Sequence, residues 1–138
     1  MFNIGRVYLF RIPEDVELIQ YLTKFARERG IRAGLVSGIG ALKNCTLGFY
    51  DQKEQKYEYI KVDEEVELSG LQGNISIKEN EPFIHVHAIV GRRSGSTLSG
   101  HLVEAKVFVA EVSVVELVGE RELRREKQGG LWLWKSGI

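Results

Sequence analysis

The chain has 138 residues, 43% hydrophobic and 28% charged, and this composition predicts one globular domain spanning residues 1–138 rather than a disordered chain. Basic and acidic residues both number 19, so the formal net charge is zero. Duplex-binding domains usually carry excess positive charge, because neutralising phosphates supplies much of their affinity. The equal numbers of basic and acidic residues therefore do not support DNA binding by the surface as a whole.

A single cysteine, Cys45, excludes an internal disulfide and a cysteine-rich zinc site, and we expect it to be a small core residue. No segment approaches the ~20 apolar residues of a membrane span. Arg6 and Arg11 interrupt the N-terminal apolar run that a secretory signal would need. These features predict a cytoplasmic protein without a membrane partner.

The N-terminal segment predicts one strand and one helix. Arg6–Arg11 is rich in β-branched and aromatic residues, which favour a strand. Across Val16–Arg29, apolar residues recur at helical spacing from Leu18 to Phe25. Gly30 follows in the position that commonly ends a helix. We expect this helix to cover one face of a sheet.

Strand-like segments dominate the rest of the chain. They are Ile31–Ile39, Cys45–Asp51, Tyr57–Val62, Val66–Ile77, Phe83–Val90 and Lys106–Val118. Glycines 38 and 40 lack the further residues of a nucleotide-binding loop, so we expect a bend or a close backbone approach. The charged segment Glu120–Lys127 is nearly balanced and predicts a solvated face. A terminal hairpin and a helix–strand unit are both compatible with Glu120–Trp134.

The predicted fold class is α+β. Strands outnumber helices and most connections resemble hairpins. We therefore expect a single compact domain with a mostly antiparallel sheet of about six or seven strands, on which one main helix packs.

All three histidines of the chain, His85, His87 and His101, flank one predicted hairpin loop. The loop, Gly91–Gly100, is bounded by glycines and lies between two apolar runs. Because side chains i and i+2 share a face of a strand, His85 and His87 point the same way. If the loop closes symmetrically about Ser94, His87 lies opposite His101. The sequence thus predicts that three imidazoles converge.

Three converging neutral imidazoles predict a metal site with His85, His87 and His101 as ligands. This donor set favours Zn²⁺, with Ni²⁺, Cu²⁺ and Fe²⁺ chemically allowed, and it leaves a fourth position open. Strand parity places Glu104 on the face opposite His101, so we do not expect it to coordinate the ion. The alternative is that the histidines merely pack together. Catalytic residues remain unknown, enzymatic activity is uncertain, and no organic cofactor is predicted.

A series of motifs in this chain resembles the plants-and-prokaryotes conserved (PPC) domain family. The motifs occur in the order Gly30–Gly34, Val36–Leu42, Leu71–Ile77, Pro82–Ala88 and Gly100–Glu104. They extend the resemblance over nearly the whole chain, from Gly5 to Trp134. In plants this domain follows AT-hook segments in nuclear proteins, whereas in bacteria and archaea it usually stands alone.

The resemblance implies a sandwich-like α/β sheet with few helices, assembly as a homotrimer, and a metal on the histidine cluster in some prokaryotic members. Two departures matter. Ser99 stands where the family often has a second glycine before Gly100-His101, and Gly91-Arg92-Arg93 lacks the proline of an AT-hook core. We therefore expect a metal-binding protein. A DNA-binding regulator that uses Arg92 and Arg93 of an oligomer, and a purely structural oligomer, remain the alternatives.

Overall fold

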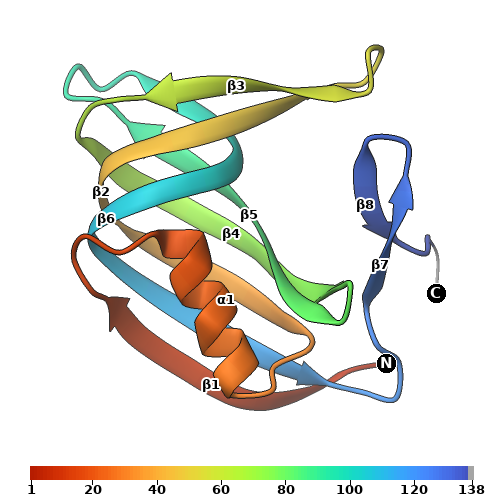
Figure 1. Ribbon diagram of the computed structural model, residues 1–138. Coiled ribbons are helices and arrows are strands. Elements are labelled where there is room, and N and C mark those ends of the chain that lie inside the picture. The colour runs from red at the N-terminus through yellow and green to blue at the C-terminus, as the bar shows by residue number, and fades with distance from the viewer. Residues whose placement is uncertain (137–138) are drawn as a thin grey trace.

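The computed structural model describes residues 1–136 and contains, within them, one helix and eight strands (Figure 1). In chain order these are β1 (Asn3–Ile12), α1 (Leu18–Glu28), β2 (Gly34–Asp51), β3 (Lys56–Val62), β4 (Val66–Lys78), β5 (Glu81–Gly91), β6 (Thr97–Val118), β7 (Arg124–Gln128) and β8 (Leu131–Trp134). The α+β prediction is confirmed. The predicted count of six or seven strands is wrong, because the C-terminal segment adds a hairpin of its own.

Helix α1 lies inside the predicted range, and its ends are fixed by local interactions. The Glu17 carboxylate accepts hydrogen bonds from the backbone N–H groups of Ile19 (3.2 Å) and Gln20 (2.6 Å) at the helix N-terminus. The same carboxylate accepts from the Ala105 N–H at 3.1 Å, which ties the helix to β6. Gly30 follows with φ 65°, as expected of a glycine that ends a helix.

Strand β2 is continuous where the sequence pattern suggested two shorter strands, and β6 begins at Thr97, well before the predicted Lys106–Val118 segment. The Gly38–Gly40 region shifts the register of β2 against β4 without ending the strand. A Cβ atom on residue 40 would lie only 2.1 Å from the carbonyl oxygen of Val109. The glycines thus allow β2 to bend while it stays paired with β6, which confirms the close backbone approach expected of them.

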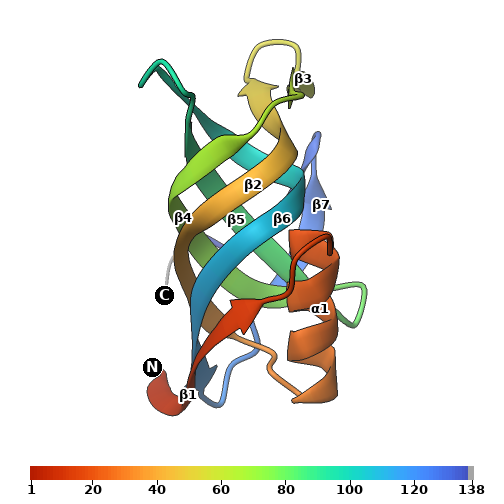
Figure 2. The ribbon, with the colours of Figure 1, turned by 90° about the vertical axis from the view of Figure 1, so that its left-hand side faces the viewer.

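Four strands close the sheet into a barrel. Strand β2 pairs with β4, β4 with β5, β5 with β6 and β6 again with β2, all antiparallel. Figure 2 shows β4, β2 and β6 running diagonally side by side across the outer surface. Strands β3 and β1 extend this circuit by pairing with β2 and β6 respectively.

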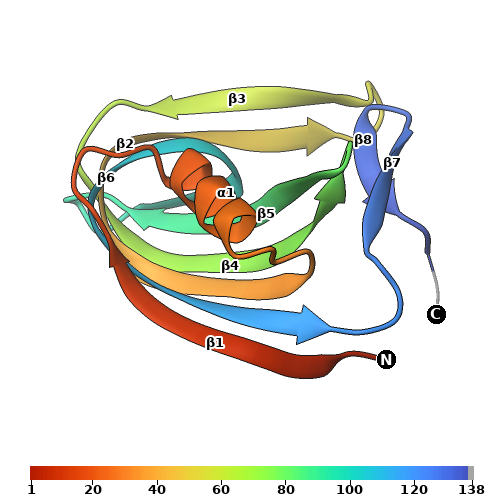
Figure 3. The same ribbon diagram turned by 60° about the horizontal axis from the view of Figure 1, so that its bottom comes forward.

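The hydrophobic core lies inside this curve, and α1 packs into it. Leu18, Leu22 and Phe25 of α1 are buried against inward-facing residues of the sheet. Phe25 also stacks on Phe10 of β1, with ring centroids 4.4 Å apart. In Figure 3 the helix lies within the curve of the strands. The outer face of β5 is therefore the face opposite α1.

The terminal segment forms the β7–β8 hairpin, one of the two arrangements compatible with its sequence. It joins the sheet through a short parallel pairing in which Ile77 faces Arg124 and Lys78 faces Arg125. The hairpin stands at the edge of the molecule in Figure 1. None of the described helices is long and apolar enough to cross a membrane.

Candidate metal centre

The three histidines meet on the outer face of β5 and β6. Their inward neighbours Ile84, Val86 and Leu102 are buried in the core, so the imidazoles point away from it. His87 pairs directly with His101 across the hairpin, as the symmetric loop predicted. The predicted convergence of the three side chains is confirmed.

The three imidazoles are nearly equidistant. Ring centroids are 5.4 Å apart for His85 and His87, 5.3 Å for His85 and His101, and 5.7 Å for His87 and His101. Each ring offers a nitrogen, and these three atoms lie within 4.8 Å of one another. No aspartate, glutamate or cysteine joins this group among the described residues. The arrangement is a facial set of three nitrogen donors.

Arg125 of β7 lies beside the histidine cluster and contacts His85. Its Nη2 lies 3.3 Å from Nδ1 of His85 and donates to Oδ1 of Asn74 at 3.0 Å. Its Nε donates to Oγ of Ser76 at 2.7 Å, and its Nη1 donates to the carbonyl oxygen of Trp132 at 2.8 Å. The side chain is only 7% exposed. The prediction that Glu120–Lys127 is a solvated face is therefore wrong at this residue.

Burial and neighbouring positive charge favour the neutral imidazoles of His85 and His101 by lowering the pKa of each. Burial lowers the pKa of His85 from 6.5 to about 4, and Arg125 and the other two histidines add to the effect. Burial also lowers the pKa of His101, with His87 and Arg125 contributing. Neutral imidazole is the form that coordinates a metal ion. The lowered pKa values of His85 and His101 therefore favour coordination of a metal ion.

One observation tests whether a metal fits. Nδ1 of His101 is buried and has no hydrogen-bond partner within residues 1–136. An unpartnered buried polar atom costs ~1–3 kcal/mol. A metal ion coordinated through this nitrogen would supply the missing partner. The donor set and this unsatisfied atom both fit a divalent ion.

The other residues considered from the sequence lie elsewhere or act indirectly. Glu104 accepts a hydrogen bond from the Thr46 hydroxyl at 3.2 Å and does not join the histidines. Cys45 is buried in the core, as expected, and burial raises the pKa of its thiol to about 11. Asn74 pairs with His85 across β4 and β5 and accepts a hydrogen bond from Arg125.

Sequence reasoning missed Arg125 and Tyr57. The Tyr57 ring lies 5.3 Å from the His101 ring. Arg125 is 40 residues from His85 and reaches it through the short parallel pairing of β7 with β4. Spacing along the chain gives no signal for either contact.

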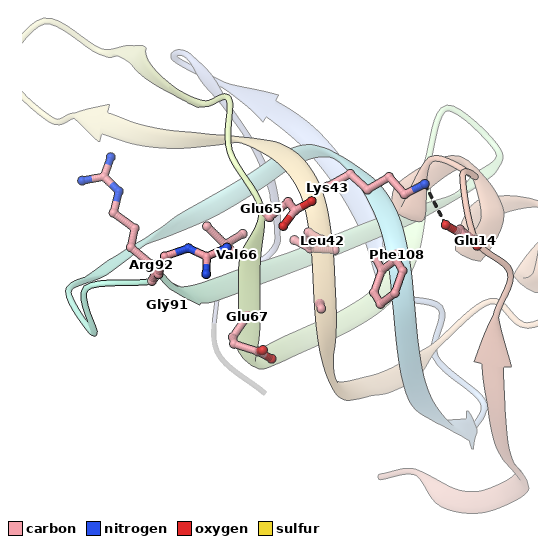
Figure 4. A pocket seen from close by; sticks show the side chains of 11 residues that line it. Glu14, Leu42, Lys43, Glu65, Val66, Glu67, Gly91, Arg92 and Phe108 are labelled. Atoms are coloured by element: carbon pink, nitrogen blue, oxygen red, sulfur yellow. Dashed lines mark ion pairs between the residues drawn. The ribbon is translucent and has the colours of Figure 1, made fainter.

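A separate cleft of about 530 Å³ opens near the β5–β6 loop and contains none of the histidines (Figure 4). Charges of both signs line it, and Lys43 pairs there with Glu14 at 2.8 Å. Its lining is formed by Glu14, Ala41, Leu42, Lys43, Glu65, Val66, Glu67, Gly91, Arg92, Arg93 and Phe108. It lacks the convergent donors of the histidine cluster.

Comparison with known proteins places these features in a family. The sequence model of the Plants and Prokaryotes Conserved (PCC) domain matches residues 1–118. The solved plant- and prokaryote-conserved (PPC) protein of Pyrococcus horikoshii is 42% identical, with a TM-score of 0.96 over 100% of this chain and 96% of its own. A metal-containing protein of Archaeoglobus fulgidus is 36% identical, with a TM-score of 0.92 over 99% of this chain and 97% of its own.

Two further relatives carry other descriptions. A Bacteroides thetaiotaomicron protein described provisionally as DNA-binding is 30% identical, with a TM-score of 0.86 over 98% of this chain and 97% of its own. The bifunctional protein GlmU of Synechococcus sp. (strain JA-3-3Ab) is 32% identical over 124 residues, or 89% of this chain. This chain spans only 18% of the length of that curated relative.

Proposed function

Because this chain belongs to the plants-and-prokaryotes conserved domain family, we propose that it binds a divalent metal ion, zinc, through His85, His87 and His101 with one coordination position left open. The observation that carries this proposal is the meeting of three imidazole nitrogens within 4.8 Å. The unpartnered Nδ1 of His101 and the metal-containing Archaeoglobus relative support it.

Zinc suits the donor set because it accepts neutral imidazole ligands and has no strong geometric preference of its own. A zinc ion held by three protein ligands can lower the pKa of a bound water or polarise a carbonyl group. The protein supplies three imidazoles on the β5–β6 hairpin, and Arg125 lies beside His85. The proposed function is therefore metal binding at a site open to a further ligand.

Metal analysis of protein purified without a polyhistidine tag tests this function. We expect about one zinc ion per chain in the wild type and its loss in the His85→Ala, His87→Ala double variant, because two of three ligands are removed. Gln72→Ala is the matched control, since this exposed residue lies opposite His87 on β4. Full metal content in the double variant would contradict the proposal.

DNA binding is the second candidate, favoured by the exposed arginines of the β5–β6 loop and by the Bacteroides relative. Arg92 pairs with Glu64 at 2.7 Å, which offsets part of the loop's charge. Anisotropy titrations of a labelled duplex at low salt test it. Affinity that falls in Arg93→Ala and with rising salt would support this function, whereas no affinity at low ionic strength would exclude it.

We also propose that the chain self-associates, as a homotrimer, through the outer face of β1, β6 and β2. Val7, Val115 and Leu35 form one cross-strand row on this face. Val7 is 63% exposed, Leu9 82% and Leu35 51%. Adjacent exposed aliphatic side chains are typical of a surface that another protein covers.

A further inference from the structure

Arg125 carries a buried positive charge that no described carboxylate compensates. Its hydrogen-bond partners Ser76, Asn74 and the Trp132 carbonyl are all neutral oxygens. Ion pairs elsewhere in residues 1–136 involve other arginines and lysines. Burying a charge without a counter-charge is costly, so this guanidinium is a site where an anion would be stabilised.

Aromatic rings hold the guanidinium in place without neutralising it. Its central carbon lies 5.1 Å from the ring centre of Phe83 and 4.5 Å from that of Trp134. Such cation–π contacts stabilise the cation, but they leave its net charge unchanged. The hairpin therefore presents a fixed positive charge beside the histidines.

A metal ion at the histidines would add to this charge. The metal-capable side chains of the described cluster include no carboxylate or thiolate, so a divalent ion there keeps its formal charge of about +2. Arg125 lies in contact with one of these imidazoles, at 3.3 Å. Two positive centres would then share a half-buried site, and an anion in the open coordination position offsets both.

The hydrogen bonding of His85 gives a second reason to expect an acceptor. Arginine has no acceptor atom, so Nδ1 of His85 accepts from Arg125 at present. A neutral imidazole that coordinates through Nε2 carries its proton on Nδ1. The N–H groups of Arg125 and of His85 Nδ1 would then face each other, and both are donors. An oxygen atom of a bound ligand could accept from them and remove this repulsion.

Given the metal-binding function proposed above, on which it rests, we propose that the loaded centre binds the carboxylate group of a small organic acid, with Arg125 as a positioning residue that selects the anion. Tyr57 lies 5.3 Å from the His101 ring and Phe83 lies 6.4 Å from the His85 ring. These aromatic walls suit the carbon part of an organic acid better than a fully polar anion such as phosphate.

Visible absorption of the Co²⁺-loaded full chain tests this site, because the spectrum of Co²⁺ reports a change of ligand. Acetate, acetamide and inorganic phosphate are titrated at constant ionic strength. We expect acetate to change the spectrum saturably, phosphate to bind more weakly, and neutral acetamide to have no effect. In Arg125→Met, acetate should bind about tenfold more weakly, as expected for loss of one nearby charge.

Two variants separate charge from folding. Arg124→Met is the matched control, because this exposed neighbour hydrogen-bonds to Asn80 and should leave acetate binding unchanged. Arg125→Lys keeps the charge and should retain acetate binding even if Arg125→Met fails to fold. Equal acetate affinity in wild type and a folded Arg125→Met, equal effects of acetate and acetamide, or tighter binding of phosphate than acetate would overturn the proposal.

Failure of the underlying function is distinguishable in the same experiment. If Co²⁺ forms no complex with the wild type, the metal-binding function is wrong. If Co²⁺ binds stoichiometrically but acetate leaves its spectrum unchanged, metal binding stands and the carboxylate site is wrong.

Discussion

At Gly73, β4 lies too close to the backbone of the histidine strand for a side chain to fit. A Cβ atom there would lie 1.9 Å from the carbonyl oxygen of His85 and 2.7 Å from Cα of Val86. Gly73→Ala must push β4 and β5 apart, so we expect a loss of about 3 kcal/mol in the free energy of unfolding. Urea denaturation followed by circular dichroism measures this loss.

The same strand offers the control. A Cβ atom on Gly70 would meet its nearest neighbour, Cδ1 of Ile89, at 3.9 Å, which is an ordinary contact. Gly70→Ala should therefore change stability by less than about 1 kcal/mol. Similar losses in the two variants would show that strand spacing does not decide the effect.

The pKa of His85 makes stability depend on pH. Its pKa is about 4 in the folded chain against a usual 6.5, so between these values the unfolded chain holds the extra proton. The free energy of unfolding of metal-free protein should therefore fall by about 1–3 kcal/mol as the pH drops from 6.5 towards 4. Urea midpoints at pH 7 and 5, with chelator present, measure this. An equally steep loss in His85→Gln would contradict the assignment.

Which residues of the site the sequence could predict depends on how local their geometry is. His85, His87 and His101 follow from the two-residue period of a strand and one hairpin register. Arg125 does not, because it depends on the pairing of β7 with β4 across 49 residues to Ser76. Because Arg125 lies in the charge-balanced segment Glu120–Lys127, its side chain was predicted to be exposed to solvent.

At the scale of elements, the periodicity of apolar residues distinguished helices from strands better than it placed the residues at which they begin and end. Helix α1 was predictable because its apolar residues recur on one face. Strand β2 was predicted as two pieces because glycine usually weakens a strand. The structure shows the other use of glycine, since Gly40 lets β2 bend against β6 without losing its pairing.

The β7–β8 hairpin should be dispensable for folding but not for the site. The buried core ends at Val114, and the family match ends at residue 118. A chain ending at Glu120 should still unfold cooperatively in urea. Removal of the β7–β8 hairpin, which carries Arg125, should raise the pKa of His85 from about 4 towards its usual value, because burial and Arg125 both lower it.

Urea denaturation and histidine NMR titration of the truncated chain measure these two effects. Loss of a cooperative transition would show that the hairpin is part of the folding unit. An unchanged His85 pKa would show that the hairpin does not control the electrostatics of the site.

At the scale of the whole molecule, closure of the barrel could not be predicted from the pattern. Strand β2 pairs with β6 along most of its length, and with β4 and then β3 along successive parts of it, and no local signal specifies such shared pairing. The alternation of buried and exposed residues predicted an antiparallel sheet, but the same alternation fits an open sheet equally well.

The proposed assembly is tested on the outer face. Leu9→Glu, Leu35→Glu places two charges where self-association would bury aliphatic side chains, so we expect a trimeric wild type and a monomeric variant by light scattering. Leu133→Glu is the matched control, because this exposed leucine lies on β8 away from that face. A monomeric wild type, or a trimeric double variant, would contradict the proposed interface.

The pairing of β1 with β6 constrains how the chain can fold during synthesis. Asn3 pairs with Val118 and Ile12 with Ala110, so β1 has no partner in the sheet until β2 to β5 and then β6 have been translated. Such long sequence separation slows folding and leaves apolar segments exposed meanwhile. On the ribosome, Val7 and Leu9 would emerge well before their partners on β6 have been made. The sheet can therefore gain β1 only after β6 has emerged from the exit tunnel.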